Sequence, residues 1–331
     1  MPLNLVSRSI CSASAIIFSA MLASSSPALR QSSDSSSGSG AIKSTAVVVN
    51  VYAIVDGPHG RVMPDLGKDD FELQEDGLEQ KLTYFSRETN TPLSLGILVD
   101  TSISQESLLP TEKTASKKFL NSVLRPNDQA FVMHFDVDVE LVQDFTAASQ
   151  KLASAIDSTK INTTGHSLVP EDAADSTGGT HLHDAVFLAS NELMKMRYGR
   201  KVLVLVTDGE DQGSKSNLQA SVEAAEKANV IVYSIVVSDP EFYKLWGARY
   251  HGDSSVRKLA SETGGRTIRV KSAQEIGPAF DQISRELHSQ YLLAYSPSNP
   301  RHDGSFRRIR VKVRAHPYTV RARSGYYDST H

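Results

Sequence analysis

Acidic and hydroxyl side chains follow an apolar run in the segment ILVDTSISQ, residues 97–105. The run stops at Asp100, and Ser102 and Ser104 come next at alternate positions. Carboxylate and hydroxyl oxygens are hard ligands that suit Mg²⁺ or Mn²⁺. The same residue types are common in ordinary turns, so this segment by itself leaves both interpretations open. A metal site requires further oxygen ligands from elsewhere in the chain.

Two other segments carry residues of the same kind. In KVLVLVTDGED, residues 201–211, an apolar run ends at Thr207 and Asp208. If the two apolar runs are neighbouring strands, Asp208 comes close to Asp100, and two such carboxylates repel one another unless a cation lies between them. In DSTGGTHLHDA, two glycines allow close backbone approach before Thr180. The hydroxyl of Thr180 is then the remaining hard ligand.

Strand-like and helical segments alternate through the middle of the chain. Apolar strand-like runs occur at residues 94–100, 129–135, 201–207, 229–237 and 266–270. Apolar positions recur at helical spacing in residues 181–196 and 273–287. This alternation predicts a doubly wound α/β fold, with a mostly parallel sheet covered on both faces, and residues 138–143 add an antiparallel edge strand. In such sheets, ligands bind at the carboxyl ends of the strands, where Asp100 and Asp208 lie.

The two ends of the chain contain short strand-like runs instead. Residues 45–88 alternate such runs with turn residues and show no helical pattern. In FRRIRVKVRA, near the other end, a period of two sets Phe306, Ile309, Val311 and Val313 against Arg308, Arg310, Lys312 and Arg314. Because two or three isolated strands are marginal, we expect both ends to combine into one β-rich module from which the central domain is inserted. The basic row is interpreted as a solvated face.

The first residues have the order of an export signal. Arg8 precedes a weakly apolar stretch, residues 10–22, and small residues follow up to Ala28. The stretch is too short for a comfortable membrane span, and a disordered tail or a short uncleaved anchor is the alternative. The predicted divisions are a signal peptide at 1–28, a flexible Ser/Gly-rich leader at 29–44, an N-terminal β segment at 45–90, the central domain at 91–290 and a C-terminal β segment at 291–331. The mature chain is then secreted, periplasmic or on the cell surface, without a membrane span.

Composition excludes some kinds of chemistry. The chain has 331 residues and a formal net charge of −3, so nothing global points to nucleic acid. The single cysteine, Cys11, lies inside the predicted signal peptide. The mature protein would therefore have no thiol for catalysis or for metal binding.

The separated pieces resemble a known metal site. Asp100-Thr101-Ser102-Ile103-Ser104, then Thr180 after Gly178-Gly179, then Asp208 after an apolar strand, are similar to the metal-ion-dependent adhesion site of von Willebrand factor type A (VWA) domains. The resemblance implies that Mg²⁺, or Mn²⁺, is bound by Asp100, Ser102, Ser104, Thr180 and Asp208. It also implies an open ligand position on the metal that a carboxylate of a protein partner can fill. The family commonly has glycine where this chain has Ile103.

The resemblance covers residues 94–290 and implies the Rossmann-like fold of the family. The flanks, with GKDDFELQEDG on one side and QYLLAYSPSNP on the other, are similar to those of a group of bacterial exported proteins. This group is abundant in acidobacteria and is built around a VWA domain. The likeness implies a bacterial source and an exported protein, but no particular partner.

Three functions are consistent with these residues. The first is a non-catalytic binding module whose metal captures an acidic residue of a protein partner. The second is a metal-dependent hydrolase or phosphotransferase with Asp100 as nucleophile, although Ser102 stands where such enzymes typically carry a second carboxylate. The third is a purely structural metal in a cell-surface scaffold. The absence of a nearby lysine or a credible general base favours the binding module over an enzyme.

Partner choice is assigned to the loop that follows the strand at 229–237. This loop, residues 239–254, leaves a carboxyl end of the sheet and therefore emerges on the metal side. It is rich in aromatic residues, which are typical of binding hot spots. Tyr243 and Trp246 are the predicted partner contacts, and the alternative is that the loop packs back on the domain as a small satellite core.

Overall fold

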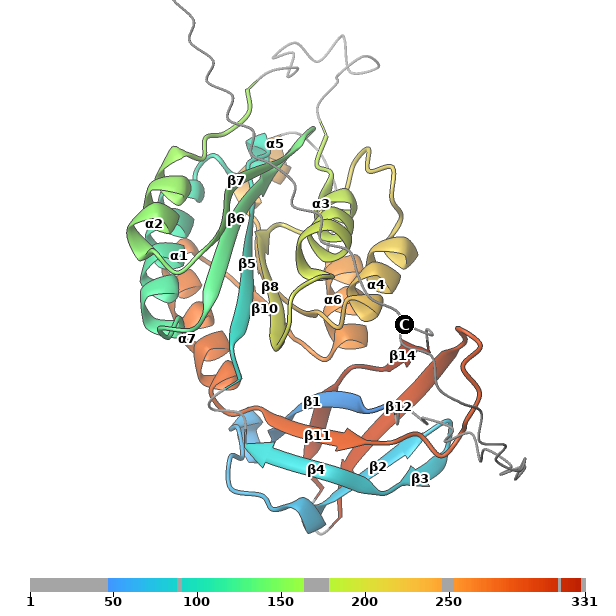
Figure 1. The fold of residues 1–331 in the computed structure, drawn as a ribbon. Coiled ribbons are helices and arrows are strands. Elements are labelled where there is room, and N and C mark those ends of the chain that lie inside the picture. Colours follow the sequence, from blue (N-terminus) through green and yellow to red (C-terminus); the bar gives the residue numbers. More distant parts are fainter. Residues whose placement is uncertain (1–46, 88–90, 164–178, 246–252, 315–316, 329–331) are drawn as a thin grey trace, which may run out of the picture. The chain divides into compact units, whose positions relative to one another are not determined.

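The computed structural model describes most of the chain after residue 46, namely residues 47–87, 91–163, 179–245, 253–314 and 317–328. Its strands form three sheets (Figure 1). One is six-stranded and lies between layers of helices, and the other two are four-stranded and antiparallel. The predicted signal peptide, 1–28, and leader, 29–44, lie outside the described residues. Among the helices that are described, none is both long and apolar enough to cross a lipid bilayer.

The six-stranded sheet has the order β10-β9-β8-β5-β6-β7. Its strands are β5 (Leu93–Asp100), β6 (Gln129–Phe135), β7 (Val139–Thr146), β8 (Arg200–Thr207), β9 (Ile231–Val237) and β10 (Thr267–Val270). All neighbours are parallel except β6 and β7. Strands β5, β8 and β9 are mostly apolar and are buried along their whole length, as expected of strands that are covered on both faces. The predicted mostly parallel sheet with an antiparallel edge strand is confirmed.

Helices cover both faces of this sheet (Figure 1). One face packs against α1 (Leu109–Val123), α2 (Ser149–Ser158) and α7 (Ile276–Leu287), which follows a short 3₁₀ turn at Ala273–Glu275. The other face packs against α3 (Leu182–Leu188), α4 (Leu218–Lys227) and α6 (Asp253–Thr263), with a π-helical turn at Ala189–Met194 extending α3. The two apolar layers fix the position of the carboxyl ends of the strands, from which the loops of the site emerge.

The remaining strands form the β module, which is built from both ends of the described chain. Its strands are β1 (Val49–Asp56), β2 (Phe71–Glu75), β3 (Leu78–Gln80), β4 (Leu82–Arg87), β11 (Tyr291–Tyr295), β12 (Phe306–Val313), β13 (Thr319–Ala322) and β14 (Gly325–Tyr327). They form sheets of order β13-β1-β11-β4 and β14-β12-β2-β3, with a shared apolar core. Early strands pair with late ones, as in β1 with β11 and β2 with β12. The prediction of one module from both ends is confirmed.

The central domain is inserted between two neighbouring strands of the module. Strand β4 precedes β5, and β11 follows α7, and β4 and β11 pair with each other. Arg87 at the end of β4 lies opposite Tyr291 at the start of β11. The chain therefore leaves the module and returns to it at adjacent positions.

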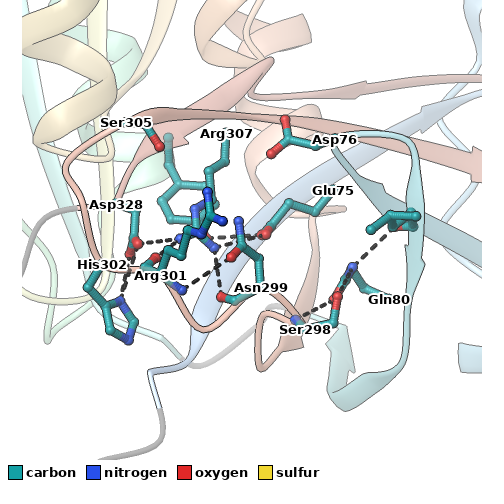
Figure 2. A network of polar contacts seen from close by, with 12 residues as sticks. Glu75, Asp76, Gln80, Ser298, Asn299, Arg301, His302, Ser305, Arg307 and Asp328 are labelled. Carbon is teal, nitrogen blue, oxygen red and sulfur yellow. Dashed lines mark hydrogen bonds and ion pairs between the residues drawn. The ribbon is translucent and has the colours of Figure 1, made fainter.

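One inward position of β12 holds an arginine, which the sequence analysis did not anticipate. Arg307 is 1% exposed, and its guanidinium bridges Glu75 and Asp328 (Figure 2). The period of two places Arg307 on the same face as Ile309 and Val313, so Phe306 lies on the opposite face. Grouping Phe306 with Ile309, Val311 and Val313 was wrong, because residues 306 and 309 are three positions apart and a period of two places them on opposite faces.

Candidate metal centre

The parallel pairing of β5 and β8 brings Asp100 and Asp208 to the same edge of the sheet. Val99 lies opposite Val206, so Asp100 lies beside Thr207 and Asp208 follows one residue later. The Thr207 hydroxyl donates a hydrogen bond to Oδ2 of Asp100 at 2.5 Å. Sequence reasoning missed this role of Thr207, although its position at the strand end was visible.

The two serines join the aspartates directly. Ser102 donates its hydroxyl to Oδ1 of Asp100 at 2.6 Å, and the Ser102 and Ser104 hydroxyl oxygens are 3.1 Å apart. The Ser104 hydroxyl in turn donates to Oδ2 of Asp208 at 2.6 Å. Each serine hydroxyl thus donates its single proton to a different carboxylate, and the two hydroxyl oxygens face each other, which brings both aspartates and both predicted serine ligands together.

A single 3₁₀ turn, Ile103–Gln105, gives this segment its shape. It starts directly after Ser102, so that both serines lie on the inner side of the turn. Left-handed backbone outside glycine occurs, among the described residues, only at His59, Asp76 and Asn229. Ile103 is therefore accommodated without strain in the place where the family commonly has glycine.

Thr180 is placed by backbone pairing rather than by its side chain. Its N–H donates to the Gln212 carbonyl, and the Gln212 N–H donates back, both at 2.9 Å. A Cβ at Gly179 would come within 2.6 Å of the Gln212 carbonyl oxygen, so this approach requires glycine. Gly178 lies outside the described residues. The structure thus joins each predicted serine ligand to one aspartate by a hydrogen bond, brings the two serine hydroxyl oxygens within 3.1 Å of each other, and sets Thr180 against the loop that follows Asp208.

Asp136, at the end of β6, ties the loops of the site together and was missed in the sequence. Its Oδ2 accepts the Thr101 hydroxyl at 2.6 Å, and its Oδ1 accepts the Asn162 side-chain amide at 2.9 Å. Its carbonyl accepts the N–H of His181, the neighbour of Thr180, at 2.7 Å. The available signal was an aspartate directly after a third apolar run, in the same relation to its strand as Asp100.

The electrostatics of the centre are unfavourable for two ionised carboxylates. Asp100 is fully buried, and Asp208 is nearly so. Burial, together with the charge of Asp208, raises the pKa of Asp100 to about 7, although hydrogen bonds from Ser102 and Thr207 oppose the shift. The donors that reach Asp100 are hydroxyl and amide groups, which carry no positive charge.

The donor set fits a hard divalent cation. Two carboxylates and three hydroxyls are the ligands of Mg²⁺ or Mn²⁺, rather than those of Zn²⁺ or copper. Over the described ranges, no three Asp, Glu, His or Cys side chains are arranged to hold one metal ion. A site here therefore depends on hydroxyl ligands in addition to Asp100 and Asp208.

The predicted partner loop is partly helical. Pro240–Leu245 forms the short helix α5, and α6 already begins at Asp253, so a loop over 239–254 was wrong. Asp239 accepts the Glu241 N–H at 2.9 Å and precedes a proline, and an aspartate followed by a proline is a signal for the start of a helix. Tyr243 lies in α5, and Trp246 lies outside the described residues.

The start of α5 is linked to the segment that follows the serines. The Ser107 hydroxyl donates to Oδ2 of Asp239 at 2.7 Å. This hydrogen bond is the main reason that the pKa of Asp239 is lower than usual. The contact places α5 on the same side of the sheet as the predicted metal ligands.

Comparison with known proteins identifies the central domain. Residues 95–282 match the family described as von Willebrand factor type A domain. No curated protein matches the chain in sequence.

Several solved structures have a similar fold. Proximal thread matrix protein 1 from the mussel byssus is 16% identical, covers 65% of this chain and 51% of its own, and has a TM-score of 0.49. A von Willebrand factor type A protein from Catenulispora acidiphila is 12% identical over 76% of this chain and 71% of its own, with a TM-score of 0.48. An aerotolerance-related membrane protein from Bacteroides fragilis is 18% identical over 59% of this chain and 98% of its own, with a TM-score of 0.44. Each likeness is one of fold and does not extend to function.

Proposed function

Because the chain belongs to the von Willebrand factor type A domain family, we propose that it is an exported, non-catalytic binding module that captures an acidic residue of a protein partner. Domains of this family commonly serve in protein interaction. The proposal adds to that general role a divalent cation, a carboxylate on the partner and a location outside the cytoplasm. Each addition rests on residues of this chain.

The metal is proposed to be Mg²⁺ or Mn²⁺, held by Asp100, Ser102, Ser104, Thr180 and Asp208. When bound, the cation would supply a concentrated positive charge and a ligand position for a carboxylate of the partner. The observation that carries the proposal is the burial of Asp100 beside Asp208 with uncharged donors around it. Like charges held together in this way are stabilised by a cation.

Catalysis by Asp100 finds less support than binding does. A nucleophilic carboxylate needs an oxygen that the substrate can approach. Asp100 is fully buried, and both of its oxygens accept hydrogen bonds, from Ser102 and from Thr207. These contacts fit a carboxylate that would help to hold a metal ion better than one that attacks a substrate.

Export is proposed from the N-terminal sequence. Arg8, the apolar stretch at 10–22 and the small residues before Ala28 have the order of a secretory signal. A secreted, periplasmic or cell-surface protein of bacterial origin agrees with the resemblance of the flanks to exported VWA proteins. Processing at residue 28 would be detected by mass spectrometry of the protein recovered from an expressing bacterium.

Calorimetric titration of the full chain with Mg²⁺ tests the metal site. Asp100→Ala and Asp208→Ala should abolish binding while the sheet stays folded. Ser102→Ala should weaken binding less, by about tenfold, because it removes one neutral ligand. An unchanged Mg²⁺ affinity in Asp208→Ala would refute the assignment.

Partner capture is tested separately. The full chain, immobilised, should retain proteins from a cell-envelope extract in Mg²⁺ and release them in EDTA. Retention that persists in EDTA would indicate a purely structural metal. Hydrolysis of generic phosphate esters in the presence of Mg²⁺, lost in Asp100→Ala, would favour the enzyme instead.

A further inference from the structure

Helix α1 carries a buried carboxylate that the five predicted ligands do not explain. Glu112 lies in the first turn of α1, on the inward face with Leu109 and Phe119, and is 0% exposed. Within the described residues, neither of its carboxylate oxygens has a hydrogen-bond partner. A buried carboxylate without partners is among the most unfavourable groups that a protein interior can contain, so its presence calls for a function.

The neighbours of Glu112 point to the metal centre. The charges that act on it are those of Asp100 and Asp208, and both oppose its ionisation. Burial and these two charges raise the pKa of Glu112 well above its ordinary value. Glu112 therefore lies close enough to the two aspartates for their charges to act on it, and a cation between them would favour its ionised form.

Gln105 shows the same shortage of hydrogen-bond donors. It is fully buried in the 3₁₀ turn, and its side-chain nitrogen lies 3.5 Å from the hydroxyl of Ser104, a predicted ligand. Its Oε1 has no partner in the part of the chain that is described. The hydroxyl of Ser116, one turn beyond Glu112, is also unpaired, so it does not supply the missing donor. Three buried acceptor oxygens, Oε1 of Gln105 and both carboxylate oxygens of Glu112, therefore lack a hydrogen-bond donor from the described residues.

Water bound to a divalent cation supplies such donors, because the cation polarises its O–H bonds. Direct ligation by Glu112 does not fit, since the described residues hold no cluster of three acidic side chains around one ion position. We infer that Glu112 is an outer-sphere ligand of the metal centre, which accepts a hydrogen bond from water bound to the cation, with Gln105 Oε1 in the same role. This inference rests on the metal site of the proposed function.

The role predicted for Glu112 is to retain the cation. A third negative charge strengthens the attraction for a divalent ion, and it weakens the pull of that ion on a partner's carboxylate. Outer-sphere partners typically change metal affinity by about 10- to 100-fold when they are removed. Glu112 would thus set how tightly the metal is held, while the hydroxyls and aspartates set where it sits.

The test is Glu112→Gln in the full chain, titrated with Mg²⁺ by calorimetry and with Mn²⁺ by electron paramagnetic resonance. The amide keeps the shape of the side chain but removes its charge. We expect a loss of affinity of about 10- to 100-fold, with a metal-free melting temperature equal to or above that of the wild type. Glu112→Asp, which keeps the charge on a shorter side chain, should give an intermediate affinity.

Glu226→Gln is the matched control. Glu226 is also a buried glutamate in a helix, but it lies at the far end of α4, where it accepts the Ser324 hydroxyl at 3.1 Å. Its replacement should leave the affinity for Mg²⁺ unchanged. A fall in affinity as large as that in Glu112→Gln would show that loss of any buried carboxylate perturbs the centre.

The outcomes separate this inference from the proposed function. If the wild type binds Mg²⁺, Asp208→Ala does not, and both Glu112 variants bind like the wild type, the outer-sphere role is refuted and the metal site stands. A loss of affinity accompanied by a lower metal-free melting temperature would show a packing defect and would also refute it. If the wild type binds neither Mg²⁺ nor Mn²⁺, the proposed function itself fails.

Discussion

Two groups of buried carboxylates in this protein are compensated in opposite ways. In the β module, Glu75 and Asp328 both contact Arg307, at 3.2 and 2.5 Å, so the chain supplies its own cation (Figure 2). At the edge of the six-stranded sheet, Asp100 receives only uncharged donors and Glu112 receives none from the described residues. The first group needs nothing from outside the chain. In the second, the donors that reach Asp100 carry no positive charge, and this difference is why we assign a structural role to the first group and propose a binding role for the second.

The largest effect is expected from removal of the positive charge of Arg307, which compensates Glu75 and Asp328. Arg307→Met keeps much of the side-chain volume but leaves Glu75 and Asp328 buried without a positive charge. We expect a loss of about 3–5 kcal/mol in the free energy of unfolding, because breaking a buried ion pair strands its partner. Urea denaturation measures the change.

Arg308→Met is the control for this experiment. Arg308 is the next residue of β12 and is exposed, so its replacement should change stability by less than about 0.5 kcal/mol. If the two variants were equally stable, the compensation of Glu75 and Asp328 by Arg307 would not contribute to the stability of the fold. The structural role assigned to this group would then be refuted.

A third buried carboxylate tests the cost of burial away from the metal centre. Burial is the main cause that raises the pKa of Glu226 to about 7, from 4.5. Between these values the folded protein holds a proton that the unfolded chain releases. The more favourable binding of this proton by the folded state therefore stabilises the protein fully below pH 4.5, and this contribution to the free energy of unfolding is lost as the pH rises to about 7.

Glu226→Gln should remove this dependence and make the protein about 2 kcal/mol more stable than the wild type at pH 8. Melting temperatures measured from pH 5 to pH 8 give the profile. Glu223→Gln, one turn earlier on α4 and partly exposed, should change the profile little, because the charge of Glu223 is the smallest of the causes that raise the pKa of Glu226. A Glu226→Gln variant that is less stable at pH 8 would mean that the glutamate acts there as a favourable ion-pair partner.

A smaller effect, with the opposite sign to that of Arg307→Met, is expected at the metal centre without metal. Asp208→Asn retains an acceptor for the Ser104 hydroxyl but removes one of two repelling charges. The metal-free protein should become about 1 kcal/mol more stable, or stay unchanged. Mg²⁺ should then no longer raise its melting temperature. A clear loss of metal-free stability would show that Asp208 is compensated within the chain, as Glu75 is.

The smallest effect is expected at the rim of the Arg307 group. His302 lies 3.2 Å from the carboxylate of Asp328, but its side chain is 38% exposed. Partly solvated pairs contribute little, so His302→Ala should lower the free energy of unfolding by less than about 1 kcal/mol. A larger loss, measured by urea denaturation, would mean that His302 shares the compensation of Asp328 with Arg307.

The strands and the approach of the two aspartates were predictable from the sequence. Continuous apolar runs identify strands that are buried on both faces, and each run ends where a polar residue can leave the sheet. Parallel pairing then brings Asp100 and Asp208 to one edge without further information. Turn chemistry was also informative in principle, because Asp239 followed by Pro240 marks the start of α5.

The remaining features depend on contacts between elements that are distant in sequence. Glu112 is flanked by polar residues, and only the docking of α1 on the sheet shows that it is buried. In the sequence, Arg307 is simply a neighbour of the basic residues of β12, and only the pairing of β12 with β2 shows that it contacts Glu75. Asp136 acts through Thr101 and Asn162, which no local pattern connects to it.

The pairing of early and late strands in the β module gives an expectation for the order in which the chain folds. Ala53 of β1 pairs with Tyr291 of β11 and with Ala322 of β13, so nearly the whole described chain separates these partners. Contacts this distant form slowly, because closing so long a loop is entropically unfavourable. The contacts of the inserted domain join residues that are closer in sequence. Once folded, this domain holds β4 and β11 side by side. We therefore expect the inserted domain to fold first and to serve as the template on which the module closes, with β1 and β2 prone to aggregation until their late partners have paired.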